Sequence, residues 1–83
     1  MKRIKVEWCE AWIKALFKKL HNEAGSDASI ETSLFFKKAE KAGLYEVNTY
    51  GSPMSKALAN LCTVDFHQGE NGEYLYSTFK INM

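Results

Sequence analysis

Apolar residues near the start of the chain recur every three or four positions, which is the spacing of one face of an α-helix. The pattern predicts a helix from about Lys5 to Glu23, with Gly25 as its stop and Glu10 and Lys14 as a favourable pair on the polar side. Its apolar face contains Trp8, Trp12, Ile13, Leu16, Phe17 and Leu20. A face rich in tryptophan can bind a partner, but more often it packs in a core, and we expect it to do so here.

A second helical pattern follows the short polar loop at residues 25–29 and ends at Gly43. Asp27 or Ser29 can cap its start, because both side chains accept hydrogen bonds from free backbone N–H groups. Its apolar positions are Ile30, Leu34, Phe35, Ala39 and Ala42, and its outward lysines are Lys37, Lys38 and Lys41. Residues 45–51 then alternate weakly, and we interpret them as a connector.

A third helix begins at Ser52-Pro53, since serine is favoured as the N-cap and proline at the first helical position. We expect it to end at Cys62 or Thr63. Its apolar side consists of Met54, Ala57, Leu58 and Leu61, and its outward side of Ser55, Lys56, Ala59, Asn60 and Thr63.

The last segment predicts a β-hairpin, with strands at Val64–His67 and Tyr74–Ile81. Asn71-Gly72 favours a two-residue type I′ turn, although the nearby Gly69 allows a wider loop. Alternation places Leu75, Phe79 and Ile81 on one face and Tyr74, Tyr76, Thr78 and Lys80 on the other. Because an isolated hairpin is only marginally stable, we expect the first of these faces to close the core.

Three helices followed by a hairpin predict an α+β fold, a single winged helix-turn-helix domain spanning residues 1–83. The 46% hydrophobic and 25% charged residues are ordinary for a globular chain. We expect a core built on Trp8, Trp12, Phe17, Phe35 and Phe79. Cys9 and Cys62 are expected to be buried free thiols in a reduced, cytoplasmic protein, and no segment reaches membrane-spanning length.

The stretches SLFFKKAEKAGLYEVNTYGSPMSKALANL and NGEYLYSTFKI, within residues 33–81, resemble the small C-terminal winged-helix domain of phage and poxvirus-type primase–helicases. The matching positions are Phe35, Phe36, Glu40, Gly43, Ser52, Lys56, Ala57, Leu58, Gly72 and Tyr74. The resemblance implies a freestanding module from a phage or another mobile element. The chain departs from this pattern at residues 45–51 and in the acidic residues of its hairpin.

Catalytic chemistry is not indicated, so we expect no catalytic residue, cofactor, metal site or small-molecule substrate. His21 and His67 are far apart and show no metal-ligand spacing with the two cysteines. A Cys62–His67 nucleophile pair can be drawn, but nothing in the sequence orients the histidine.

Two functions remain open. The first is nucleic-acid binding through Lys37, Lys38, Lys41, Ser52, Ser55, Lys56, Asn60 and Thr63, although the net charge of only +1 is low for a duplex binder. The second is a protein-interaction module that inhibits a host nucleic-acid-processing or defence complex. Its contact residues are Glu70, Glu73, Tyr74 and Tyr76 on one outer face of the hairpin, with Tyr45 and Tyr50 as further candidates.

Overall fold

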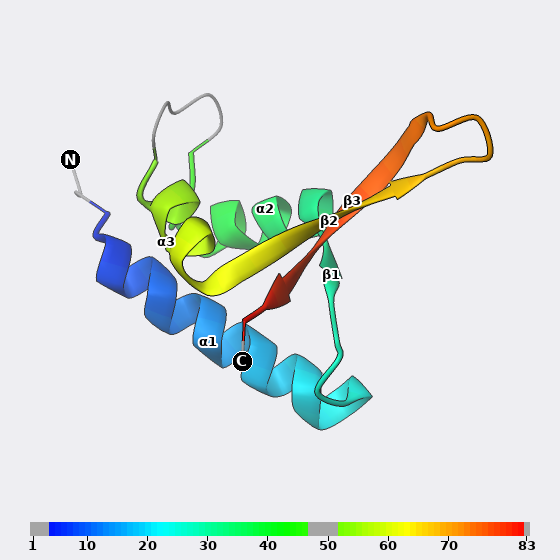
Figure 1. Ribbon diagram of the computed structural model, residues 1–83. Helices are drawn as coiled ribbons and strands as arrows, with labels where there is room; N and C mark the ends of the chain where they lie inside the picture. The colour runs from blue at the N-terminus through cyan, green and yellow to red at the C-terminus, as the bar shows by residue number, and fades with distance from the viewer. Residues whose placement is uncertain (1–3, 47–51, 83) are drawn as a thin grey trace.

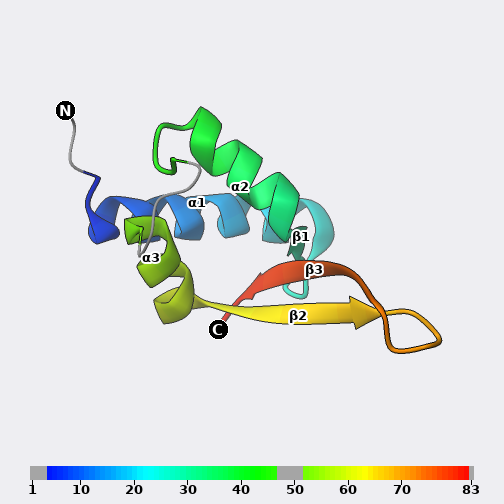
Figure 2. The same ribbon diagram turned by 90° about the horizontal axis from the view of Figure 1, so that it is seen from above.

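The computed structural model describes residues 4–46 and 52–82. Within these residues there are three helices and three strands, in the order α1 (Val6–Ala24), β1 (Ile30–Glu31), α2 (Thr32–Lys41), α3 (Pro53–Leu61), β2 (Cys62–Gln68) and β3 (Tyr74–Ile81). The strands form one antiparallel sheet in the order β1-β3-β2. The helices gather at one end of the molecule, and the β2–β3 hairpin extends away from them (Figures 1 and 2).

The α+β class is as expected, but the predicted order of three helices and then a hairpin is not confirmed, because a short strand lies between α1 and α2. Ile30 and Glu31 form the short strand β1 instead of starting the second helix. Ile30 pairs with Phe79 of β3 and is buried, because a β-branched side chain packs well on a pleated sheet. Helix α2 therefore starts at Thr32, without a side-chain cap, and Asp27 forms an ion pair with Lys80 of β3 instead of capping the helix.

The core is formed by one row of buried side chains on each helix, together with residues of the sheet. Helices α1 and α3 pack against each other, and α2 packs against β3 and β1. The buried residues are Cys9, Ile13, Phe17, Ile30, Phe35, Ala39, Met54, Ala57, Leu58 and Cys62. Trp12 is half-buried, with its ring edge-on to Phe35 at 5.4 Å.

Two large side chains predicted to lie on apolar helix faces are exposed instead, and the small Ala42 is exposed as well. The buried row of α1 passes through Cys9, so Trp8 lies about 100° around the helix and is 47% exposed. The ammonium group of Lys5 lies 5.7 Å from the centroid of the Trp8 ring. On α2, Leu34 likewise lies about 100° around the helix from its buried neighbour Phe35, and it is 46% exposed.

The start of α3 is as predicted. The hydroxyl of Ser52 accepts a hydrogen bond from the backbone N–H of Ser55 at 3.2 Å, and Pro53 occupies the first turn. The helix ends one or two residues earlier than expected, at Leu61, because the chain passes directly into β2. Thr63 is therefore a strand residue and does not belong to the outward side of α3.

The turn of the hairpin is wider than a two-residue Asn71-Gly72 turn. The N–H of Gly69 donates to the carbonyl of Glu73 at 2.9 Å, and the N–H of Gly72 donates to the carbonyl of Gly69 at 3.0 Å. Gly72 has a φ of +78°, which glycine adopts without strain. The result is a three-residue loop, which is a common way to join antiparallel strands.

Cys9 and Cys62 are buried free thiols, as expected. Burial raises the pKa of both, and that of Cys62 rises to about 11, because an apolar environment disfavours the thiolate. The predicted connector at residues 45–51 lies mostly outside the described residues. Of its two candidate tyrosines, Tyr45 packs on Phe36 with ring centroids 4.7 Å apart, and Tyr50 is not among the described residues.

Phe79 is the residue that holds the hairpin to the helices. Its ring centroid lies 5.1 Å from that of Phe35 and 5.8 Å from that of Phe36, both edge-on, and it pairs with Val64 and Ile30 across the sheet. We predict that Phe79→Ala lowers the free energy of unfolding by about 3 kcal/mol, measured by urea denaturation.

The matched control is Phe66→Ala. Phe66 lies on the same face of the sheet but is 65% exposed, so its loss should change the free energy of unfolding by less than about 0.5 kcal/mol. Equal losses for the two variants would mean that Phe79 is not the anchor of the hairpin.

Candidate interaction site on the hairpin arm

From its anchor at Phe79 the hairpin extends beyond the helices, and we call residues 64–76, which begin opposite Phe79 and include the tip, the arm (Figure 1). Its apolar side chains are exposed to an unusual degree. The exposed fractions are 43% for Val64, 65% for Phe66, 61% for Tyr74, 56% for Leu75 and 43% for Tyr76. The prediction that Leu75 faces the core with Phe79 is therefore wrong, because no helix lies beneath this part of the strand.

A β-bulge in β3 sets the direction of the side chains on the arm. His67 pairs with Tyr76 and Gln68 pairs with Tyr74, so Leu75 is an extra residue with no partner on β2. Neighbouring residues on a strand point to opposite faces, and their cross-strand partners follow them. The bulge consequently places Tyr74 and Tyr76 on opposite faces of the hairpin, whereas the alternation in the sequence predicts a shared face.

The first face of the arm continues the face that packs on the helices. The hydroxyl of Tyr74 shares a hydrogen bond with that of Ser77 at 3.2 Å, and its ring lies 6.3 Å from that of Phe66. Ser77 pairs with Phe66 across the hairpin and is buried, and its hydroxyl also lies 2.8 Å from that of Thr32. Val64, Phe66 and Tyr74 thus form an exposed apolar extension of the core face.

The second face carries a stacked aromatic pair. The rings of His67 and Tyr76 lie 4.4 Å apart with an angle of 10° between their planes. Nε2 of His67 lies 3.1 Å from the hydroxyl oxygen of Thr78, which fixes the orientation of the imidazole. The arm therefore presents aromatic surface on both faces instead of the single tyrosine face predicted from the sequence.

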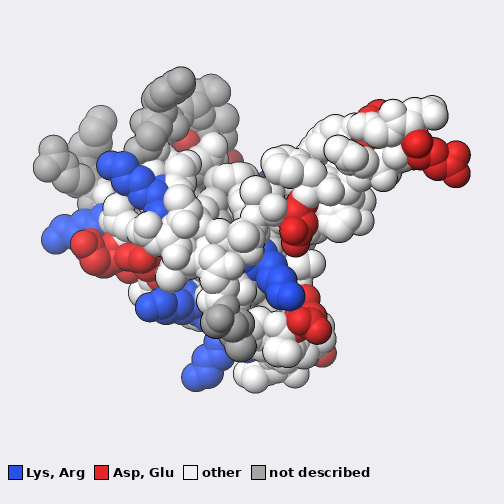
Figure 3. Space-filling model, viewed as in Figure 1, with Lys and Arg blue, Asp and Glu red and all other residues white. Residues whose placement is uncertain are grey.

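The arm is acidic. It contains Asp65, Glu70 and Glu73, and the chain has no Lys or Arg between Lys56 and Lys80. Figure 3 shows this arm as mostly uncharged surface with acidic groups toward its tip, whereas the Lys side chains seen in that view lie away from the tip. The carboxylate of Glu73 accepts a hydrogen bond from the N–H of Asn71 at 3.0 Å, which orders the loop at the tip.

The predicted nucleic-acid-binding residues are spread over three elements. The exposed members are Lys37, Lys38 and Lys41 on α2, Ser55, Lys56 and Asn60 on α3, and Thr63 on β2. Ser52 is only 3% exposed, and its hydroxyl is used as the helix cap. In the view of Figure 3 the basic side chains are separate and interleaved with acidic ones, so they form no continuous positive stripe there.

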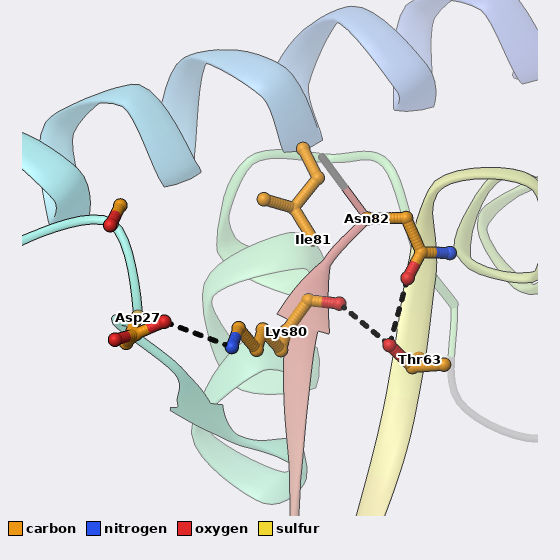
Figure 4. A pocket seen from close by; sticks show the side chains of 6 residues that line it. Asp27, Thr63, Lys80, Ile81 and Asn82 are labelled. Carbon is orange, nitrogen blue, oxygen red and sulfur yellow. Dashed lines mark hydrogen bonds and ion pairs between the residues drawn. The ribbon is translucent and has the colours of Figure 1, made fainter.

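An open hollow of about 400 Å³ lies where the end of β3 meets the loop after α1 (Figure 4). Nζ of Lys80 pairs with a carboxylate oxygen of Asp27 at 3.2 Å, and the hydroxyl of Thr63 donates to Oδ1 of Asn82 at 2.9 Å. These four polar side chains of the hollow are therefore engaged with one another, which leaves them poorly suited to hold a charged ligand.

A second hollow of about 240 Å³ lies between α1 and Ile81, beside Lys14, Lys18 and His21. Nε2 of His21 is buried and makes no hydrogen bond among the described residues. The histidine ring packs edge-on to Phe17 at 6.2 Å, so part of its surface belongs to the core.

The described residues give little support for catalysis. A nucleophilic thiol needs a lowered pKa, whereas burial raises the pKa of Cys62 to about 11. Nε2 of His67 is engaged in a hydrogen bond with the hydroxyl of Thr78. Residues 4–46 and 52–82 contain no group of three His, Cys, Asp or Glu side chains placed to hold a metal ion. Among the same residues, no helix has both the length and the apolar character to cross a bilayer.

Comparison with models of protein families, with curated proteins and with solved structures found no significant match to this chain.

Sequence reasoning found the acidic tip and the two tyrosines but missed Phe66, the most exposed large apolar side chain of the arm. The lengths of the predicted elements do indicate that this residue is exposed. Strand β3 has eight residues and spans roughly 26 Å, whereas the ten residues of α2, the helix that packs on it, span only about 15 Å. A hairpin of that length must extend beyond the short helices that cover its base, and its distal apolar residues must then be exposed.

Proposed function

We propose that this chain is a protein-binding module and that the arm is its contact surface. One observation carries the proposal: Phe66, Tyr74, Leu75 and Tyr76 are exposed together on a structure that extends from the body. Exposed apolar side chains scattered singly are normal, but a contiguous exposed apolar patch typically marks an interaction site, and Phe66 and Tyr74 form one on the first face of the arm, with ring centroids 6.3 Å apart. Tyrosine and other aromatic residues are also enriched in the parts of interfaces that contribute most to binding.

The charge of the arm indicates what kind of partner surface would be complementary to it. The arm carries Asp65 on β2 and Glu70 and Glu73 at its tip, so the proposed complementary surface is apolar where it meets the aromatic residues and basic around them. Proteins that process nucleic acid present basic surfaces of this kind. An acidic arm bound there would occupy the place of the phosphate backbone, and the proposed consequence is inhibition of such a host complex.

The proposal extends to the fold family, which we take to be a winged helix with β2 and β3 as the wing. The hairpin follows α3, and β1 joins it as a short third strand, which is compatible with that fold. Two features depart from a DNA-binding helix-turn-helix. Helix α2 ends at Lys41 and α3 begins at Pro53, farther apart than the usual turn of about four residues, and the wing is acidic.

Nucleic-acid binding is the second candidate function, favoured by the exposure of Lys37, Lys38 and Lys41 on α2 and of Lys56 and Asn60 on α3. Lysines of this kind contact phosphates, and an exposed asparagine can read adenine in the major groove. The arm would then have to point away from the nucleic acid, because its carboxylates repel phosphate.

The first test of the protein-binding proposal is a capture experiment from nuclease-treated host lysate, followed by an affinity measurement with the captured protein. We predict that Phe66→Ala weakens binding by about 2 kcal/mol, roughly thirtyfold in Kd, because truncation removes an exposed aromatic contact. The melting temperature should stay close to that of the wild type, since Phe66 contributes little to the core.

Trp8→Ala is the matched control, because Trp8 is a large exposed apolar residue on the helical body, at 47% exposure. It should leave the affinity unchanged. Capture that is lost after nuclease treatment, or that weakens equally in the two variants, would contradict a protein partner at the arm.

The second candidate is tested by salt-dependent binding to duplex DNA and to RNA. If α2 contacts phosphate, changing Lys37, Lys38 and Lys41 together to Ala should lower the slope of log K against log salt by up to about 3. Glu40→Gln on the same helix is the control, and it should not reduce the slope. The absence of detectable binding by the wild type at low salt would remove this candidate.

A further inference from the structure

Among the residues that the structure describes, strand β2 pairs with no strand on its outer side, which we call its free edge. The strand order β1-β3-β2 gives β3 two neighbours but gives β2 only one. Neither α2 nor the short β1 lies beside the outer edge of β2 in the two views of the fold (Figures 1 and 2). An edge strand presents unpaired N–H and C=O groups, which can pair with another extended chain.

The register identifies which backbone groups face this edge. The N–H of Asn82 donates to the carbonyl of Leu61, and the N–H of Gly69 donates to the carbonyl of Glu73, at the two ends of the ladder. In an antiparallel ladder, residues that bond to the neighbouring strand alternate with residues whose groups point away from it. On the β2 side, the bonds at both ends of the ladder involve odd-numbered residues, so the odd-numbered residues of β2 direct their backbone groups to β3. Val64, Phe66 and Gln68 therefore direct their N–H and C=O groups to the free edge.

This edge lacks the features that usually prevent strand pairing. Residues 62–68 contain no lysine and no proline, which are the common protective residues on edge strands. The β-bulge, another protective device, lies on β3 instead of on the open edge. Asp65 is the only Asp, Glu, Lys or Arg residue of β2.

We infer that the free edge of β2 receives an extended, lysine- or arginine-bearing segment of the partner protein as an additional strand of the sheet. This inference rests on the proposed function and specifies how the arm would bind. Backbone hydrogen bonds to Val64, Phe66 and Gln68 set the register, as in other cases of strand addition. Asp65, Glu70 and Glu73 attract the basic side chains of the segment, and Phe66 contributes apolar contact.

The same charges disfavour a second copy of this chain at the edge. A two-fold antiparallel pairing of β2 with itself, centred on the strand, brings Asp65 close to its own counterpart. Like charges that face each other across strands are destabilising. A basic segment meets no such repulsion.

The inference is tested by NMR titration of the isotope-labelled protein with a short peptide of alternating lysine and valine. The amides of Val64, Phe66 and Gln68 should shift and exchange more slowly with solvent, because they acquire acceptors. Two matched peptides serve as controls: one has glutamate in place of lysine, and the other has N-methylated valines, which cannot form the ladder. Neither should slow these amides.

A variant of the protein itself, Val64→Pro, tests whether the backbone of the free edge binds the peptide, and Val64→Ala is its control. Proline removes an N–H that faces outward and leaves the bonds to β3 in place. Its affinity for the lysine–valine peptide should be about fivefold lower than that of Val64→Ala, which corresponds to the loss of one backbone hydrogen bond. Melting curves of both variants confirm that the comparison is made on folded protein.

The inference is overturned if millimolar lysine–valine peptide leaves the three amides unchanged, or if the N-methylated peptide acts equally well. It is also overturned if the same amides shift with protein concentration alone, which would indicate self-pairing, or with an oligonucleotide instead of the peptide. A failure here combined with loss of partner binding in Phe66→Ala would leave the arm as the contact surface but exclude strand addition as its mode.

Discussion

The packing of the Phe79 side chain, on strand β3, against the rings of Phe35 and Phe36, on helix α2, is the contact on which the rest of the structure depends. A two-stranded hairpin alone is marginally stable in water, and β1 adds only two residues to the sheet. The hairpin is therefore held by its base. There Phe79 pairs with Ile30, Ser77 bonds to Thr32, and Lys80 forms an ion pair with Asp27.

The anchored base explains how the arm can carry exposed aromatic side chains. Ser77 is the last buried residue toward the tip of β3, and every residue of that strand beyond it is exposed. Stability comes from the base, so the arm is free to present Phe66, Tyr74 and Tyr76 to a partner. Its three carboxylates disfavour association between copies of the chain, since like-charged arms repel each other.

Much of the architecture could be predicted from the sequence, because local signals determine it. Helical periodicity located α1 to within one residue, and Ser52-Pro53 located the start of α3. The bounds of β3 were also as predicted. The strand β1 could not be predicted, because two residues carry no periodic signal and Ile30 is a strand residue only through its pairing with Phe79.

The candidate site was only partly predictable for a similar reason. The acidic residues and tyrosines are visible in the sequence, but the face on which each tyrosine lies depends on the bulge at Leu75. A bulge is a property of the pairing between two strands, and alternation along one strand cannot reveal it. Likewise, the exposure of Val64, Phe66 and Leu75 depends on where the helices end beneath the sheet.

Residue-resolved amide hydrogen exchange on the isolated protein tests the central claim, a hairpin fixed at its base with an uncovered arm. The account predicts slow exchange for Thr63 and Asp65, whose N–H groups face β3, and for Phe79 at the anchor. It predicts fast exchange for Val64 and Phe66, whose N–H groups face the free edge. Exchange at Val64 and Phe66 as slow as at Thr63 and Asp65 would contradict it, because the edge would then already be covered.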